Sequence, residues 1–265
     1  MPWTVSHAAA VLPFRRWCPA RLSFVALVIG SMSPDFAYYF GLAAIADFAH
    51  SLPGLFAAAL PGGLLVLAAA WLLRGLLAEL LPQPHRFAWQ QAFASLDRDL
   101  DWRRGIVLAA SILLGAATHA AWDSFTHATG PPVEHSEFLQ RALFRVGSRE
   151  VETYNFLQHA STLFGIVVLA IAYRSWLGSA AAAGAPPPDA QDPARWWVLG
   201  SIAAFGAATC AAWIAAGILR GQPDLQSLVV EAVFVASNLI AIVYLAAALA
   251  WRGVRSGRGG GDGGG

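Results

Sequence analysis

Long apolar stretches constrain the fold of this chain more than any other feature. A helix needs about 20 consecutive apolar residues to cross a bilayer, and five stretches approach or exceed that length: about 53–77, 104–122, 156–177, 196–219 and 227–250. The chain is 57% hydrophobic and 12% charged, against about 45–50% and about 25% in soluble domains. We therefore expect an all-α, polytopic transmembrane helical bundle in contact with the lipid bilayer.

The N-terminal region allows two arrangements. Residues 22–40 are apolar, but Gly30-Ser31-Met32-Ser33-Pro34-Asp35 interrupts them. Either residues 22–40 form a sixth span, or residues 5–33 form a helical hairpin that dips into the membrane. In the first case His7 lies on the inner side of the membrane, and in the second it lies on the outer side.

The arginines indicate the orientation of the spans. If residues 22–40 cross the membrane, 13 arginines lie on one side and four on the other, and the hairpin changes this split to 10 and 7. Loops rich in Arg and Lys face the cytoplasm. Both N-terminal arrangements favour a cytoplasmic C-terminus, the sixth span more strongly than the hairpin. We expect a multi-pass protein of the cell membrane.

Composition also predicts the domain boundaries. We expect a membrane-embedded domain over 1–177, a flexible linker over 178–195, a two-span hairpin over 196–252 and a disordered tail over 253–265. The net charge of +1 gives no indication of a nucleic-acid partner. Cys18 and Cys210 make neither a disulfide framework nor a Cys-x-x-Cys motif.

Three metal-ligating side chains recur at intervals of four residues. His119, Asp123 and His127 would lie on one helix face at the end of the apolar stretch 104–122. Ionisable groups at such a depth usually mark a functional site, and imidazole with carboxylate suits zinc. The stripe is about 12 Å long, so one ion can use all three residues only if the helix ends near Asp123. Ordinary polar capping of a helix end is the alternative.

Three further residues fall near the same ends of the spans, and His7 joins them only if residues 5–33 form the hairpin. Asp35 follows a Ser-Pro turn, His50 and His7 each precede an apolar run, and His159 lies at the start of 156–177. Taken singly, Asp35, His50 and His7 are better explained as turn, cap or interface residues. For His159, a ligand or acid–base role and a buried hydrogen-bonded role are equally supported.

The ordered set carries a resemblance. It comprises Ser6-His7, Ile29-Gly-Ser-Met-Ser-Pro-Asp35, His50-Ser51 and Gly115-Ala-Ala-Thr-His119-Ala-Ala-Trp-Asp123. This set resembles a family of uncharacterised bacterial integral membrane proteins. That family is similar to the predicted membrane-bound metal-dependent hydrolases and, distantly, to zinc-dependent phospholipase C. The resemblance covers about 1–177.

The resemblance implies a ligand set: His7, Asp35, His50, His119 and Asp123 as metal ligands, with Asp35 as the bridging ligand. His127 and His159 fall where the phospholipase-like pattern has further ligands. Phe36-Ala37 and Phe48-Ala49 depart from the hydrolase pattern, which implies fewer metal ions or a loss of activity.

The expected function is a metal-dependent hydrolase, with zinc as the metal and a phosphoester or lipid-linked substrate. Asp35 or Asp123 would orient or deprotonate a metal-bound water, and His127 or His159 would protonate the leaving group. A membrane protein that binds or passes a metal ion without catalysis is the alternative, as is a structural homologue without metal. Few polar residues continue below His119, only Thr118 and Ser111, which weighs against ion passage.

Overall fold

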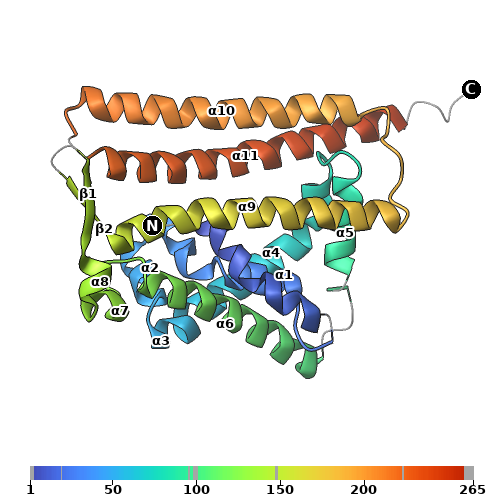
Figure 1. Ribbon diagram of the computed structural model, residues 1–265. Helices are drawn as coiled ribbons and strands as arrows, with labels where there is room; N and C mark the ends of the chain where they lie inside the picture. Colours follow the sequence, from blue (N-terminus) through green and yellow to red (C-terminus); the bar gives the residue numbers. More distant parts are fainter. Residues whose placement is uncertain are drawn as a thin grey trace, which may run out of the picture. The chain divides into compact units, whose positions relative to one another are not determined.

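The computed structural model describes residues 3–18, 20–94, 96–97, 101–146, 149–222 and 224–259. Within these ranges the chain is helical except for one β hairpin and short connections (Figure 1). The elements in chain order are η1 (Thr4–Trp17), α1 (Phe24–Gly30), η2 (Ser33–Phe40), α2 (Ala43–Ala49), α3 (Leu52–Gly54), η3 (Leu55–Ala59), α4 (Leu60–Ala78), α5 (His85–Ala94), α6 (Trp102–Ser124), α7 (Pro131–Glu134), α8 (Glu137–Gln140), β1 (Ala142–Val146), β2 (Arg149–Glu152), α9 (Thr153–Ala182), α10 (Asp192–Leu219) and α11 (Leu225–Gly259).

Five helical segments in the described part of the chain are long and apolar enough to cross a membrane. They are Leu52–Ala78, Trp102–Ser124, Thr153–Ala182, Asp192–Leu219 and Leu225–Arg255. The expected all-α membrane bundle is therefore confirmed, and the chain is a multi-pass membrane protein. Each of the five helices overlaps one of the apolar stretches and extends beyond it at one or both ends.

The apolar stretch 22–40 is not one helix. It forms α1 and η2, which are separated at Ser31 and Met32. Pro34, the second residue of η2, disfavours α-helical backbone at Ser33, while α1 is too short to cross a bilayer. The N-terminal region is thus a set of short helices, with η1 packed against α1 and α6. The described residues of 22–40 therefore do not form the single long helix that a sixth span requires, and the insertion of a hairpin into the membrane stays a prediction.

Two glycines bring α1 and α6 into backbone contact. A Cβ on Gly30 would lie 2.2 Å from the carbonyl oxygen of Ile112, and one on Gly115 would lie 2.3 Å from that of Leu27. Glycine permits this approach because it has no side chain. The contact places the C-terminal end of α1, at Ser31, beside the last two turns of α6.

The chain divides into two compact units, each with its own contacts. The first comprises 1–69 and 94–176, and the second comprises 70–93 and 177–265. In the second unit, the buried Arg195 guanidinium donates to the carboxylates of Asp189 and Asp192 and, through Nε, to the carbonyl oxygen of Glu79. Leu76, Leu80, Ile202 and Ala248 form its apolar core.

Helices extend into both ends of the predicted linker and into the start of the predicted tail. α9 extends to Ala182 and α10 begins at Asp192, so the irregular connection is shorter than the predicted 178–195. α11 continues to Gly259, and residues 260–265 of the predicted tail lie outside the described residues. Pro193 in the first turn of α10 needs no amide hydrogen-bond partner there, which suits an early helix start.

Candidate metal centre

His119 and Asp123 occupy the last two turns of α6. His119 is fully buried, and its Nε2 lies 3.4 Å from Oδ2 of Asp123. The helix ends at Ser124, with Phe125 as its C-cap. The three-residue stripe is therefore interrupted directly after Asp123, and His127 lies beyond the helix.

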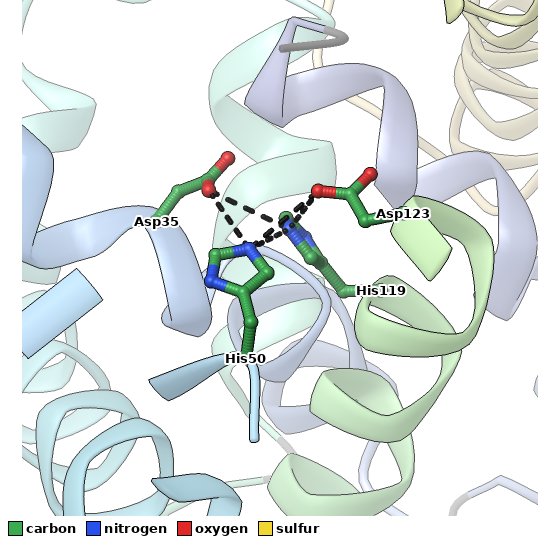
Figure 2. A group of neighbouring side chains, drawn as sticks. All are labelled: Asp35, His50, His119 and Asp123. Atoms are coloured by element: carbon green, nitrogen blue, oxygen red, sulfur yellow. Dashed lines mark hydrogen bonds and ion pairs between the residues drawn. The ribbon is translucent and has the colours of Figure 1, made fainter. Parts of the chain in front are cut away.

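Asp35 and His50 reach the same place from other segments of the first unit. Asp35 lies in the first turn of η2, and His50 is the C-cap residue of α2. Oδ1 of Asp35 lies 3.4 Å from Nε2 of His50 and 3.5 Å from Nε2 of His119. Figure 2 shows the two carboxylates and the two imidazoles directed toward one another.

The four groups lie close enough together to share one metal ion. Their ligand atoms all lie within 4.8 Å of one another. The two Nε2 atoms are 3.2 Å apart, and Nε2 of His50 lies 3.5 Å from Oδ2 of Asp123. Zinc bonds of about 2.0–2.1 Å would separate neighbouring tetrahedral ligands by about 3.3–3.4 Å. The four residues could therefore hold a metal ion.

Backbone carbonyl groups fix the tautomer of both histidines. Nδ1 of His119 lies 2.8 Å from the carbonyl oxygen of Ser31, and Nδ1 of His50 lies 2.8 Å from that of Ala46. A carbonyl oxygen only accepts, so each Nδ1 carries a proton and donates it. When the rings are neutral, this tautomer directs the lone pair of Nε2 into the centre, which is the usual arrangement of metal-ligating histidine.

The two oxygens of the Asp35 carboxylate have different surroundings: Oδ2 accepts a hydrogen bond from Thr4, and Oδ1 faces the two histidines. Thr4 donates a hydrogen bond of 2.7 Å from Oγ1 to Oδ2 of Asp35. Oδ1 is buried, and its contacts to Nε2 of His50 and Nε2 of His119, at 3.4 and 3.5 Å, are longer than ordinary hydrogen bonds. A buried carboxylate oxygen with only such long contacts is costly, and a cation shared with the two histidines would satisfy it.

His7 lies beside the group of four and not within it. Its ring stacks on that of His119, with centroids 3.8 Å apart, and its Nε2 lies 3.3 Å from Oδ1 of Asp123. Burial, followed by the charge of His119, lowers the pKa of His7 to about 4. His7 is therefore neutral at physiological pH, and a ligand role for it stays a prediction.

The electrostatics of the centre favour a positive charge. Burial lowers the pKa of His50, but hydrogen bonds with Asp123 and Asp35 outweigh burial and raise the pKa to about 10. Burial raises the pKa of Asp35, but hydrogen bonds with His119 and His50 outweigh it and hold the pKa well below its usual range. The carboxylate stays ionised, so protons and metal ions compete for the same place.

Access to the centre is uneven. The side chain of His50 is 22% exposed, whereas those of Asp35, His119 and Asp123 are at most 7% exposed. An incoming molecule would therefore approach the centre from the side of His50.

His127 and His159 lie outside the group of four. Nδ1 of His127 lies 3.0 Å from the carbonyl oxygen of Asp123, and its Nε2 lies 3.3 Å from Nε2 of the buried Gln158. Both ring nitrogens of His127 are thus engaged by protein groups. His159, the next residue on α9, is exposed.

Several supporting groups have no signal in the sequence. Ser31 and Ala46 act through their backbone carbonyls, which any residue type offers. Thr4 and Gln158 act through side chains, but neither belongs to a recognisable spacing. Tyr38 donates a 2.5 Å hydrogen bond from Oη to Oδ1 of Asp47. In the sequence, Tyr38 follows Asp35 by three residues, and no other pattern connects it with the centre.

Comparison with protein families identifies the family. The model described as "Domain of unknown function (DUF4184)" matches residues 1–250, so the chain belongs to this family. The match continues past residue 177, where the resemblance based on motifs stopped, and includes most of the last two spans. Comparison with curated proteins and with solved structures gave no match.

Proposed function

We propose that this member of the DUF4184 family is a membrane-bound hydrolase that depends on a divalent metal ion, and that the ion is zinc. One observation carries the proposal. Two imidazole nitrogens and two carboxylate oxygens from η2, α2 and α6 lie close enough together to share one metal ion. Histidine with carboxylate is the ligand chemistry of many zinc hydrolases. The resemblance to the predicted membrane-bound metal-dependent hydrolases points the same way.

The residues divide into ligands and groups that act on water. Asp35, His50 and His119 would hold the ion, because each is fixed by a second contact to Thr4, Ala46 or Ser31. A zinc ion lowers the pKa of a bound water to about 7. Asp123, adjacent to this position and in contact with His7 through its other oxygen, would orient the water or accept its proton.

Two histidines, His127 and His159, are the proposed donors of a proton to the leaving group. His127 is the nearer of the two predicted donors, with Nδ1 3.8 Å from Oδ2 of Asp123. It would act only after releasing the amide of Gln158. His159 would require a substrate that extends along the exposed side of α9.

The spans support a site at the membrane interface. The metal centre lies at the end of Trp102–Ser124 and just before Leu52–Ala78. With five spans and arginine-rich segments inside, the C-terminus would be cytoplasmic and the centre would lie on the outer side of the cell membrane. A phosphoester of a lipid or of another interfacial molecule is the substrate class that fits this place.

Turnover tests the proposal. Purified protein should hydrolyse a phospholipid or an aryl phosphodiester, lose that activity with a chelator and regain it with zinc. Asp123→Asn should lower kcat by about 100-fold or more, as for loss of a general base, while His135→Ala, at an exposed histidine of the same unit, should not. Full zinc occupancy without turnover on any such substrate would contradict a hydrolase.

A second candidate is a metal-binding membrane protein without catalysis. The observation that favours it is the number of protein groups around the centre. If all four residues bind the ion, no position is left for water, as is typical of structural zinc sites. Passage of an ion has less support: Thr118 and Ser111 donate to carbonyls of their own helix, those of Gly115 and Val107. If the protein binds no metal, both proposals fail, and the remaining interpretation is a structural homologue without metal.

A further inference from the structure

The segment between two metal-centre residues forms an apolar projection. η2 and α2 are joined at Gly41, whose φ of 71° lies in the left-handed region that favours glycine. Asp35 lies at the start of this helical pair and His50 at its end. We call residues 36–48 the tip segment. No charged residue occurs in it before Asp47.

The tip segment exposes its large apolar side chains. Phe40 is 76% exposed, and every residue from 40 to 45 is exposed. The exposed large apolar side chains of the segment are Phe40, Leu42, Ile45 and Phe48. Exposed apolar patches of this kind mark interaction sites.

The tip segment continues into the exposed apolar surface at the start of a candidate span. Leu52 and Phe56, at the start of the span Leu52–Ala78, are also exposed apolar residues. Gly54 lies so close to the carbonyl group of Phe48 that a Cβ on it would be 1.7 Å from the oxygen. The exposed apolar end of the span and the base of the tip segment are therefore one continuous surface.

Polar groups of the segment gather at its base, on the side of the metal centre. Tyr38 donates its hydroxyl to Asp47, and its ring lies 6.3 Å from that of His50, the most exposed of the four residues. The segment thus has an apolar end and a polar base beside the opening. Aromatic residues with a polar atom are typical of the boundary between hydrocarbon and headgroups.

We propose that the tip segment inserts into the bilayer and that the metal centre receives a lipid-borne substrate sideways from the membrane. The occupant of the apolar surface is lipid acyl chain. The headgroup of the substrate would lie at Tyr38 and Asp47, next to His50, at the level where its phosphoester reaches the centre. The insertion stands by itself, whereas the entry of substrate rests on the proposed function.

Spin labels test the insertion without reference to activity. Cys18 and Cys210 are replaced by serine, and a nitroxide is attached at Ala44→Cys in full-length protein in phosphatidylcholine vesicles. Ile106→Cys, on the exposed face of α6 within a span, serves as the lipid reference, and Glu150→Cys, in β2, as the water reference. Insertion predicts that oxygen relaxes the label at Ala44 as at Ile106, and that a water-soluble nickel chelate does not.

Two results of this measurement overturn the insertion. Relaxation by the nickel chelate, as at Glu150, places the tip segment in water. Shielding from both reagents indicates that protein covers the segment, either a second copy or another partner.

Two substrates test the entry route. Phe40→Ser/Leu42→Ser should lower turnover of phosphatidylcholine in vesicles by about tenfold, with unchanged zinc content and unchanged turnover of a water-soluble aryl phosphodiester. Phe138→Ser, an equally exposed residue on α8, is the control. Equal loss on both substrates, or no loss, overturns lateral entry. If the unmodified protein hydrolyses neither substrate, the proposed function fails, while the labels still decide the insertion.

Discussion

At the scale of single residues, the centre depends on groups that hold the ligands in place. His119 and His50 are oriented by backbone carbonyls, and Asp35 by the hydroxyl of Thr4. Such supporting contacts typically contribute about 10–100-fold to metal affinity. Only the Thr4 contact is removable by a side-chain change that keeps the shape of the residue.

Thr4→Val should therefore weaken zinc binding by about 10–100-fold. The substitution leaves the ligands intact but frees Asp35 to rotate away from the histidines. Competition of zinc with a chromophoric chelator measures the affinity. Thr118→Val, which removes a hydroxyl bonded only to its own helix, should leave the affinity unchanged. Equal affinities in Thr4→Val and unmodified protein would show that Asp35 needs no such support.

The pH dependence of the metal-free protein follows from two histidines with opposite pKa shifts. The pKa of His50 rises from 6.5 to about 10 on folding, so its contribution to stability is complete below about pH 6.5 and is lost as pH rises through about 10. The pKa of His7 falls from 6.5 to about 4, so its contribution is present above about pH 6.5 and is lost as pH falls toward 4.

Metal-free protein should therefore be most stable near pH 6.5. The midpoint of detergent-induced unfolding, recorded after chelation across about pH 5–10, measures this. His50→Gln should flatten the alkaline side of the curve. A midpoint that rises steadily to pH 10 would contradict a raised pKa of His50.

At the scale of elements, the contact of α1 with α6 positions the centre. Gly115 allows the backbone of α1 to approach, and this places the Ser31 carbonyl at Nδ1 of His119. The four residues of the centre come from segments that are short except for α6. Their placement therefore depends on packing between elements more than on the conformation of any one element.

Gly115→Ala should separate α1 from α6 and lower both stability and zinc affinity. Overpacking of this kind typically costs about 1–3 kcal/mol, and movement of Ser31 adds the loss of His119 orientation. Gly105→Ala, on the same helix with nothing within 4 Å of the new Cβ, is the matched control. Chelator competition and unfolding midpoints measure the two effects. A Gly115→Ala protein that matches Gly105→Ala in both would contradict the positioning role.

The helices and the positions of the ligands differ in how far the sequence predicts them. Apolar length predicts the five spans because lipid requires every backbone group to be bonded within the helix. The spacing of His119 and Asp123 predicts their common face. Their meeting with Asp35 and His50 depends on contacts such as Gly115 with Leu27, which no local pattern encodes. The resemblance based on ordered motifs supplied these long-range partners.

At the scale of the whole molecule, the arginines and the odd number of spans indicate the orientation. The segment between Ser124 and Thr153 would lie outside, and that between Ala182 and Asp192 inside. Single cysteines at Glu137 and Ala190, in protein without Cys18 and Cys210, test this with a membrane-impermeant maleimide on intact cells. Labelling at Glu137 alone is expected, and labelling at Ala190 alone would reverse the orientation.

Metal content tests the central claim most directly. Protein purified in detergent from zinc-supplemented cells should contain about one tightly bound zinc ion per chain, or a second if His7 is also a ligand. His119→Ala and Asp35→Asn should each remove that ion, whereas His135→Ala should retain it, as measured by inductively coupled plasma mass spectrometry. Zinc content near zero in the unmodified protein, or equal content in His119→Ala, would contradict a metal centre at Asp35, His50, His119 and Asp123.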